Sequence, residues 1–195
     1  MSGEARRPYD IDTLTDVALR VFAERGYDGA SMDDVARAAG ITKASIYHHV
    51  SGKEALLDRG LTRALDALFA VLDEPQAREG PALSRLRHIT GRVAEITLGM
   101  LPELTVLVRV SGSSKSERAA LERRRSFDRT FSDLIAEAQR TGAVRTDLDP
   151  RLIARLIFGM SNSVVEWYRH GSSIAEGAVV RAVVAIAFDG IVRPR

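Results

Sequence analysis

The spacing of apolar residues is the feature that most limits what this chain of 195 residues can fold into. Leu14, Val17 and Val21 follow the i, i+3, i+7 pattern of one helix face, and similar patterns recur along the chain. No segment sustains the alternation of apolar and polar residues that is typical of a strand. The sequence therefore predicts an all-α protein.

Residues that cap helices divide the N-terminal part into three helical segments. Gly26 ends the first, because glycine readily adopts the left-handed conformation that follows a helix. Ser31 begins a short second helix as its N-cap, with Asp34 placed to accept from the free backbone N–H groups. Gly40 closes it, and a third helix around Ile46 follows and ends near residue 50.

The remaining residues predict a larger helical region. Ser51-Gly-Lys-Glu54 has the spacing of a capping box, so we expect a fourth helix over about 52–73. Residues 75–81 contain two prolines and a glycine and predict a connection. We expect further helices over about 83–97, 104–110, 117–141, 150–168 and 174–191. The predicted domains are 1–53 and 54–195, joined by the helix over 52–73.

Two short helices around Gly40, preceded by a helix with its own apolar face, form the pattern of a helix-turn-helix unit. Ala36 and Ala39 are small enough for the helices to approach, and Ile46 anchors the third helix in a core. Residues 35–53 contain no Asp or Glu, although residues 1–53 carry seven Lys and Arg against eight acids. The expected surface for DNA phosphates and base edges is Thr42, Lys43, Ser45, Tyr47 and His48.

These residues resemble the TetR family of repressors. The resemblance rests on Phe22-Ala-Glu-Arg-Gly-Tyr27, Ser31-Met-Asp-Asp-Val-Ala36, Ala39-Gly-Ile-Thr-Lys-Ala-Ser-Ile-Tyr47-His-His49 and Ser51-Gly-Lys-Glu-Ala-Leu-Leu57. One departure is Val50, where the family usually has phenylalanine, and it affects the packing of the third helix on the fourth.

The resemblance implies DNA contacts for each of these exposed residues. Thr42, Lys43 and Ser45 would approach bases, Tyr47 and His48 phosphates or base edges, and Lys53 and Ser31 the backbone phosphates. Three residues have structural alternatives. Capping alone explains Ser31, Lys53 is also compatible with a solvated first-turn lysine, and Tyr47 with packing against the fourth helix.

The composition argues against an enzyme, a metal site and a resident cofactor. The chain has no cysteine, and His48 and His49 point about 100° apart on a helix, so they do not share a metal easily. No glycine-rich phosphate loop is present. The chain starts with no signal-peptide pattern, and the most apolar stretch, 179–188, is too short to span a bilayer. We therefore expect a cytoplasmic protein, with a helical ligand carrier or an adaptor that does not bind DNA as the alternatives.

The C-terminal region is expected to sense a ligand and to form a dimer. The resemblance implies a pocket between helices and a homodimer through the last two. The last helix carries one face of mostly small residues that suits such an interface: Ala178, Val179, Ala182, Ala185, Ile186 and Asp189.

Polar residues on otherwise apolar helix faces are the candidate ligand contacts. Arg124 and Asp128 lie four apart, beside Phe127 and Phe131, and form either a salt bridge or a site for an anionic ligand. Phe158, Asn162 and Glu166 are similar candidates on the next helix, where polar residues also suit a dimer seam.

The effector class comes from a second resemblance. Residues 147–169 are similar to the C-terminal part of TetR regulators of fatty-acid, aromatic-acid and steroid breakdown, which implies an acyl-CoA thioester as the effector. The cluster Arg118, Arg123, Arg124, Arg125 and Arg129 would suit its phosphates, or is a solvated basic face. The function expected is a dimeric repressor of a palindromic double-stranded DNA operator, released by a small hydrophobic or acyl-CoA-like molecule.

Overall fold

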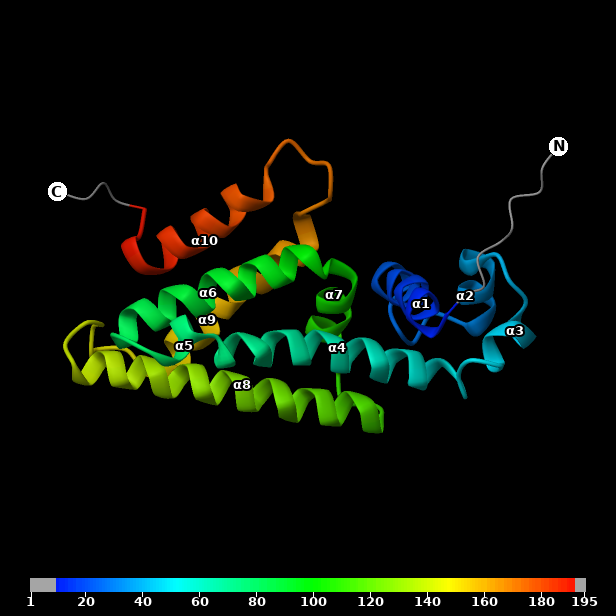
Figure 1. Ribbon diagram of the computed structural model, residues 1–195, viewed down its shortest axis with the longest axis horizontal. Helices are drawn as coiled ribbons and strands as arrows, with labels where there is room; N and C mark the ends of the chain where they lie inside the picture. Colours follow the sequence, from blue (N-terminus) through cyan, green and yellow to red (C-terminus); the bar gives the residue numbers. More distant parts are fainter. Residues whose placement is uncertain (1–9, 192–195) are drawn as a thin grey trace.

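The computed structural model describes residues 10–191 and is built from helices (Figure 1). No strand occurs among the described residues, so the predicted all-α class is confirmed. The helices are α1 (Ile11–Arg25), α2 (Met32–Ala39), α3 (Lys43–Tyr47), α4 (Lys53–Asp73), α5 (Pro75–Arg78), α6 (Ala82–Gly99), α7 (Leu101–Arg109), α8 (Lys115–Arg140), α9 (Pro150–Trp167) and α10 (Glu176–Asp189).

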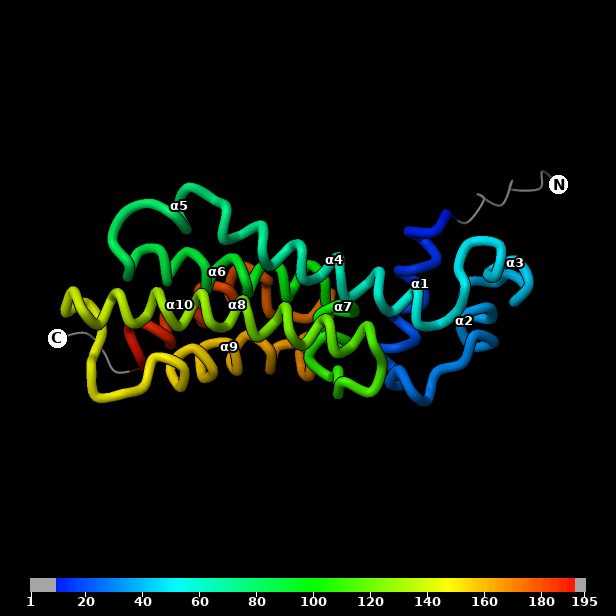
Figure 2. The backbone as a smooth tube through the Cα atoms, turned by 90° about the horizontal axis from the view of Figure 1, so that it is seen from below, coloured from blue at the N-terminus to red at the C-terminus, as the bar shows by residue number. Residues whose placement is uncertain are grey.

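The first three helices form a head at one end of an elongated molecule, and α3 lies at its outer tip (Figures 1 and 2). The long helix α4 leaves the head and runs into a bundle made with α6, α7, α8 and α9. Helix α8 packs along both α4 and α9, while α10 covers the outer side of α6. None of the described helices is long and apolar enough to cross a membrane.

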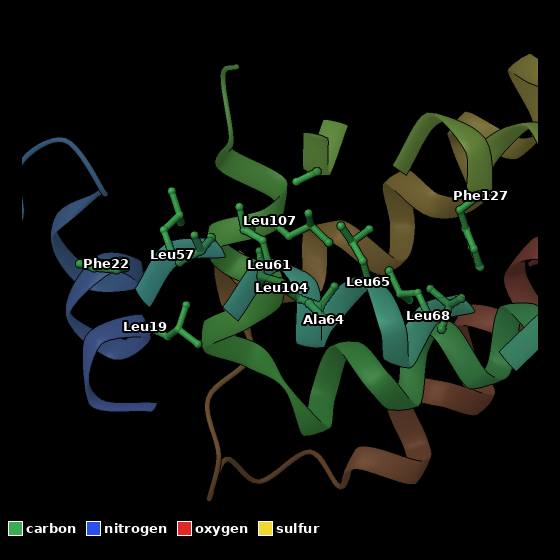
Figure 3. Packing of buried hydrophobic residues seen from close by; sticks show 14 of the residues in the cluster. Leu19, Phe22, Leu57, Leu61, Ala64, Leu65, Leu68, Leu104, Leu107 and Phe127 are labelled. Atoms are coloured by element: carbon green, nitrogen blue, oxygen red, sulfur yellow. The ribbon is translucent and has the colours of Figure 1, made fainter. Parts of the chain in front are cut away.

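Helix α4 carries one continuous row of buried leucines from the head into the bundle (Figure 3). Near its start, Leu57 and Leu61 lie toward α1, and farther along Leu65 and Leu68 lie among α6, α7 and α8. The buried residues of the head and of most of the bundle form one cluster. The apolar core therefore runs through the predicted domain boundary at 53/54. That boundary stays a prediction about which residues serve which function.

Side-chain caps mark where five of the ten described helices begin. The capping box predicted at Ser31 is confirmed, because the Ser31 side chain accepts from the Asp34 N–H and Asp34 accepts from the Ser31 N–H. Asp149 caps α9 as predicted, with proline at the first helical position. The box predicted at Ser51 is wrong. Gly52 is the N-cap of α4 without a side-chain bond, and Glu54 accepts from the Ser116 N–H instead.

The predicted connection over 75–81 contains one short helix, α5. Proline at its first turn lacks the N–H that a helix start leaves unpaired, so Pro75 favours a helical turn there. The other predicted helices begin and end within a few residues of those observed.

A glycine sets the distance between the head and the bundle. An added Cβ on Gly60 of α4 would lie 2.4–2.9 Å from the three outer carbons of Leu19 in α1. Leu19 is fully buried, so it has little room to move. The close approach of α1 and α4 thus depends on Gly60.

Candidate DNA-binding surface and ligand cavity

Helix α3 is fixed at its start by its own side chains. The Thr42 hydroxyl accepts from the Ser45 N–H at 3.1 Å and lies 2.8 Å from the Ser45 hydroxyl. This cap satisfies a backbone N–H that a helix start otherwise leaves free. Thr42 and Ser45 are therefore held in one orientation at the outer tip of the head.

Burial separates the inner side of α3 from its outer side. Ile46 is fully buried and Val50 is nearly so, which shows that valine fills its place between α3 and the rest of the head. Tyr47 is 49% exposed, which is compatible both with a DNA contact and with the alternative in which one side of the ring packs against α4. Thr42, Lys43 and His48 are exposed as well. The outer side thus offers hydroxyl, ammonium, phenol and imidazole groups to solvent.

The cations of the head have partners within the protein. Lys43 Nζ donates to Asp33 of α2 at 2.9 Å, and Arg37 donates to Asp34 at 3.0 Å. The Asp33 carboxylate holds the pKa of Lys43 above its usual value. Residues 35–53 contain no acid, but the exposed surface around α3 does, because α2 brings Asp33 beside α3. Exposed pairs contribute little stability, so DNA phosphates can replace Asp33 at small cost.

Lys53 ties the start of α4 to the turn between α1 and α2. Its ammonium donates to the carbonyl oxygens of Tyr27 at 2.8 Å and Ala30 at 2.9 Å. It also lies 4.2 Å from the centre of the Tyr27 ring. Lys53 is therefore held by the protein and is not a merely solvated lysine. These contacts also explain why a lysine stands at a helix start, where the helix dipole disfavours a positive charge.

Ser31 and Asp34 form the most strongly bonded cap in the head. The Asp34 carboxylate accepts from the Ser31 N–H and hydroxyl and pairs with Arg25 and Arg37. These bonds, those from Ser31 above all, lower the pKa of Asp34 to about 2. Capping therefore accounts for Ser31.

A cavity of about 700 Å³ lies inside the bundle between α4, α6, α7, α8 and α9. Its apolar lining includes Leu68, Leu104, Leu107, Phe127 and Phe158. The Phe127 and Phe158 rings lie 5.6 Å apart, which is within the range of favourable aromatic contact. The polar lining consists of five arginines of α8 and α9 together with Asp128, Ser132, Thr97 and Asn162. A volume of this size suits a small organic ligand.

Family models match both parts of the chain. The model of the tetR family of bacterial regulatory proteins matches residues 14–59, which contain α2 and α3. The model of the tetracyclin repressor-like C-terminal domain matches residues 79–191, more than half of the chain. The chain belongs to the TetR family. It is thus a member of a family of helix-turn-helix transcriptional regulators.

Similar proteins extend the TetR match over nearly the whole chain. The crystal structure of the TetR regulator SCO3833 from Streptomyces coelicolor A3 superposes with a TM-score of 0.88 and 48% identity, covering 99% of this chain and 97% of that one. The repressor KstR2 of Rhodococcus jostii is 28% identical over 93% of this chain and 90% of its own. AibR, crystallised with isovaleryl coenzyme A and operator DNA, shares the fold at a TM-score of 0.79 and 22% identity, covering 91% of this chain and 97% of that one.

Five of the seven predicted ligand residues of this TetR chain line the cavity. Phe131 does not, but it is fully buried and its ring lies 4.6 Å from that of Phe158, so it supports the wall from behind. The predicted ligand contact is wrong for Glu166, which is exposed and pairs with Arg109 of α7. The five that line the cavity are Arg124, Phe127, Asp128, Phe158 and Asn162.

The predicted salt bridge between Arg124 and Asp128 does not form. Arg124 donates to the Leu107 carbonyl oxygen at 3.2 Å instead. Burial raises the pKa of Asp128, while the charges of Arg124 and Arg155 act in the opposite direction. Asp128 is the only acid that lines this cavity among the described residues.

The predicted arginine cluster of α8 divides into two groups. Arg118 donates to the carbonyl oxygens of Gly112 and Ser113, and Arg123 pairs with Asp66. Arg124, Arg125 and Arg129 line the cavity. They are joined there by Arg151 and Arg155 of α9, which sequence reasoning missed. The signal was present as two arginines four residues apart on a mostly apolar helix.

Helix α7 joins the cavity to the head of this regulator. Leu104 and Leu107 line the cavity, while α7 also packs against α1. The Arg63 guanidinium donates to both Asp16 of α1 and Glu103 of α7. Helix α7 is thus in contact with both the cavity and a helix of the head.

The outer faces of α9 and α10 leave large apolar side chains exposed. Leu156 of α9 is 59% exposed and Ile186 of α10 is 47% exposed. Two residues predicted for the dimer face of the last helix lie elsewhere. Val179 is buried among residues of α6 and α9, and Asp189 pairs with Arg87 of α6. Ala182, Ala185 and Ile186 remain exposed as predicted.

Proposed function

We propose that this TetR-family chain is a cytoplasmic repressor that binds a palindromic operator as a homodimer and is released by a small hydrophobic or acyl-CoA-like effector. The observation that supports it best is the outer side of α3, where capped hydroxyls, Lys43 and Tyr47 are exposed over the buried anchor Ile46. Helices presented in this way enter the major groove.

The dimer is proposed through α9 and α10. Their exposed apolar residues, Leu156 and Ile186 among them, need covering in water, and a second copy of the chain supplies the same surface. A two-fold dimer places two α3 helices roughly 34 Å apart, one turn of DNA. Leu156→Glu is expected to leave a folded monomer with operator affinity roughly 10²–10⁴-fold weaker, because the second half-site no longer adds to binding. Sedimentation and anisotropy measure both effects, and a dimer that persists contradicts this interface.

Effector release is proposed to act through α7. A ligand in the cavity touches Leu104 and Leu107, while Arg63 holds the same helix to α1. The effector lowers operator affinity to the extent that it prefers an arrangement of the heads that does not fit the operator. The acyl-CoA class is supported by AibR, whose structure of this fold includes isovaleryl coenzyme A.

Capture of genomic DNA tests the proposal. Purified protein is mixed with sheared genomic DNA from its source at physiological salt, and the retained fragments are sequenced. We expect an inverted repeat with half-sites one turn apart, because α3 is presented once per protomer. Fragments without a shared sequence would contradict the proposal and would favour a ligand carrier or an adaptor.

A further inference from the structure

Four arginines around the cavity have side chains that form no hydrogen bond or ion pair within the described part of the chain, although the charge of Arg155 acts on Asp128. Arg125 and Arg129 of α8 and Arg151 and Arg155 of α9 line it, and they are called the rim arginines below. Their guanidinium groups form no hydrogen bond or ion pair with any described residue, whereas Arg85, Arg92 and Arg123 elsewhere in the bundle all pair with carboxylates.

The helix geometry brings the rim arginines together. Residues four apart lie on one face of a helix, so each helix offers a pair one turn long. Helices α8 and α9 pack against each other, and both pairs border the same cavity. With Arg124, the lining holds five arginines against one acid, Asp128. Like charges gathered in this way repel one another, and a bound anion removes that repulsion.

The buried part of the lining limits the kind of anion. Leu68, Leu104 and Phe127 are buried and apolar, whereas the rim arginines are exposed, so we expect the charged part of a ligand to bind at the rim. One carboxylate engages one guanidinium in a bidentate pair, whereas a diphosphate offers enough oxygens and charge for several. Helices α8 and α9, which carry the rim arginines, belong to the bundle and lie away from α3 (Figure 1), so the rim is separate from the surface proposed for DNA.

We propose that the rim arginines bind a diphosphate-type group of the effector, whose apolar part occupies the cavity lined by Leu104, Phe127 and Phe158. This inference rests on the proposed function, and it names the group and residues that select the effector. It predicts that apolar molecules without phosphates are poor effectors, even where they fill the cavity.

Calorimetric titration of the full-length protein with simple probes tests the inference. Inorganic pyrophosphate probes the rim alone, octanoyl-coenzyme A combines an apolar chain with a diphosphate, and octanoate has the chain only. We expect saturable binding of the first two, at affinities that fall as salt rises, because exposed charges are screened. Octanoate is expected to bind at least roughly tenfold more weakly than octanoyl-coenzyme A, because it lacks the charge-assisted bonds.

Matched variants separate recognition from general charge. Arg125→Ala with Arg151→Ala is expected to weaken pyrophosphate binding roughly tenfold or more. Arg140→Ala is the control, since Arg140 is an exposed arginine of α8 that lies outside the cavity lining. Asp128→Asn removes the one acid that lines the cavity among residues 10–191, and it is expected to tighten binding, which a merely structural role would not do.

Three results would overturn the inference. The first is that the wild type shows no saturable binding of pyrophosphate or octanoyl-coenzyme A. The second is that Arg140→Ala weakens pyrophosphate binding as much as the rim variant does. The third is that the rim variant keeps its affinity for pyrophosphate but no longer has the mass of a dimer. The last result would assign these arginines to acids of the partner subunit. Operator capture by the wild-type protein is measured separately, so a negative result at the rim arginines does not contradict the proposed repressor function.

Discussion

The head and the cavity rim both expose cations, but they hold them differently. In the head, Lys43 pairs with Asp33 and Lys53 is bonded to two carbonyl oxygens. At the rim, Arg125 and Arg151 have no partner among the described residues. Paired cations stay in place without a ligand, and we expect Lys43 to exchange Asp33 for a DNA phosphate. Unpaired cations repel each other until an anion binds, so a rim ligand is expected to stabilise the bundle.

Among the changes that compare the head with the bundle, the largest effect is expected from the double change Lys43→Ala and Tyr47→Ala. Both side chains lie on the outer side of α3 and are about half exposed, outside the buried core, so fold and dimer should persist. Operator affinity is expected to fall about 100-fold, the sum of two contacts of about 1–3 kcal/mol each. Anisotropy titrations measure it, with Arg140→Ala as the control. Unchanged affinity would show that the exposed head does not read DNA.

Gly60→Ala tests the joint between the two regions. The added Cβ overlaps with Leu19 of α1, which is buried and unable to move aside. We expect a loss of about 1–3 kcal/mol in the free energy of unfolding, as in other overpacked cores. Urea unfolding measures it, and Gly99→Ala, where the added Cβ meets nothing within 4 Å, is the control. Equal stability of the two variants would mean that α1 and α4 are not closely packed.

Arg63→Ala tests the link through which the regions communicate. It leaves Glu103, whose side chain is 11% exposed, without its cationic partner. We expect a loss of about 1–2 kcal/mol, below the cost of breaking a fully buried pair because Arg63 is itself partly exposed. Thermal unfolding measures it, and Arg63→Ala with Glu103→Gln should recover part of the loss. Absence of any recovery would argue against the pairing.

Ser31→Ala should give the smallest effect, about 1 kcal/mol for a lost N-cap. Asp34 has a folded-state pKa of about 2, below its usual 3.8. Its contribution to stability is therefore present above about pH 4 and is lost as the pH falls toward 2. Without the Ser31 hydroxyl bond, we expect the pKa of Asp34 to rise toward 3.8. NMR titration of the carboxyl carbons checks this, and an unchanged pKa would assign the shift to the backbone N–H of residue 31 and to the arginines.

Sequence reasoning predicted what depends on neighbours along the chain. The caps at Ser31 and Asp149 and the burial of Ile46 follow from local spacing, and all three are confirmed. The box at Ser51 is wrong because Glu54 bonds to Ser116, far away in the sequence.

The candidate site was predicted less completely than the fold, because the residues that contact each other there come from different helices. Asp33 reaches Lys43 across ten residues, which a count of acids over 35–53 does not show. Glu166 points to Arg109, and Arg151 and Arg155 join the cavity only through the packing of α9 on α8. Helical periodicity predicts on which face of its helix a residue lies, but not which other helix packs against that face.

The central claim is that the exposed side of α3 selects a DNA sequence. It is tested most directly by titrating the wild-type protein against a captured fragment and against the same bases in shuffled order, at physiological salt. The account predicts binding of the captured fragment at least about 10³-fold tighter than of the shuffled one. Equal affinity for both fragments would contradict it.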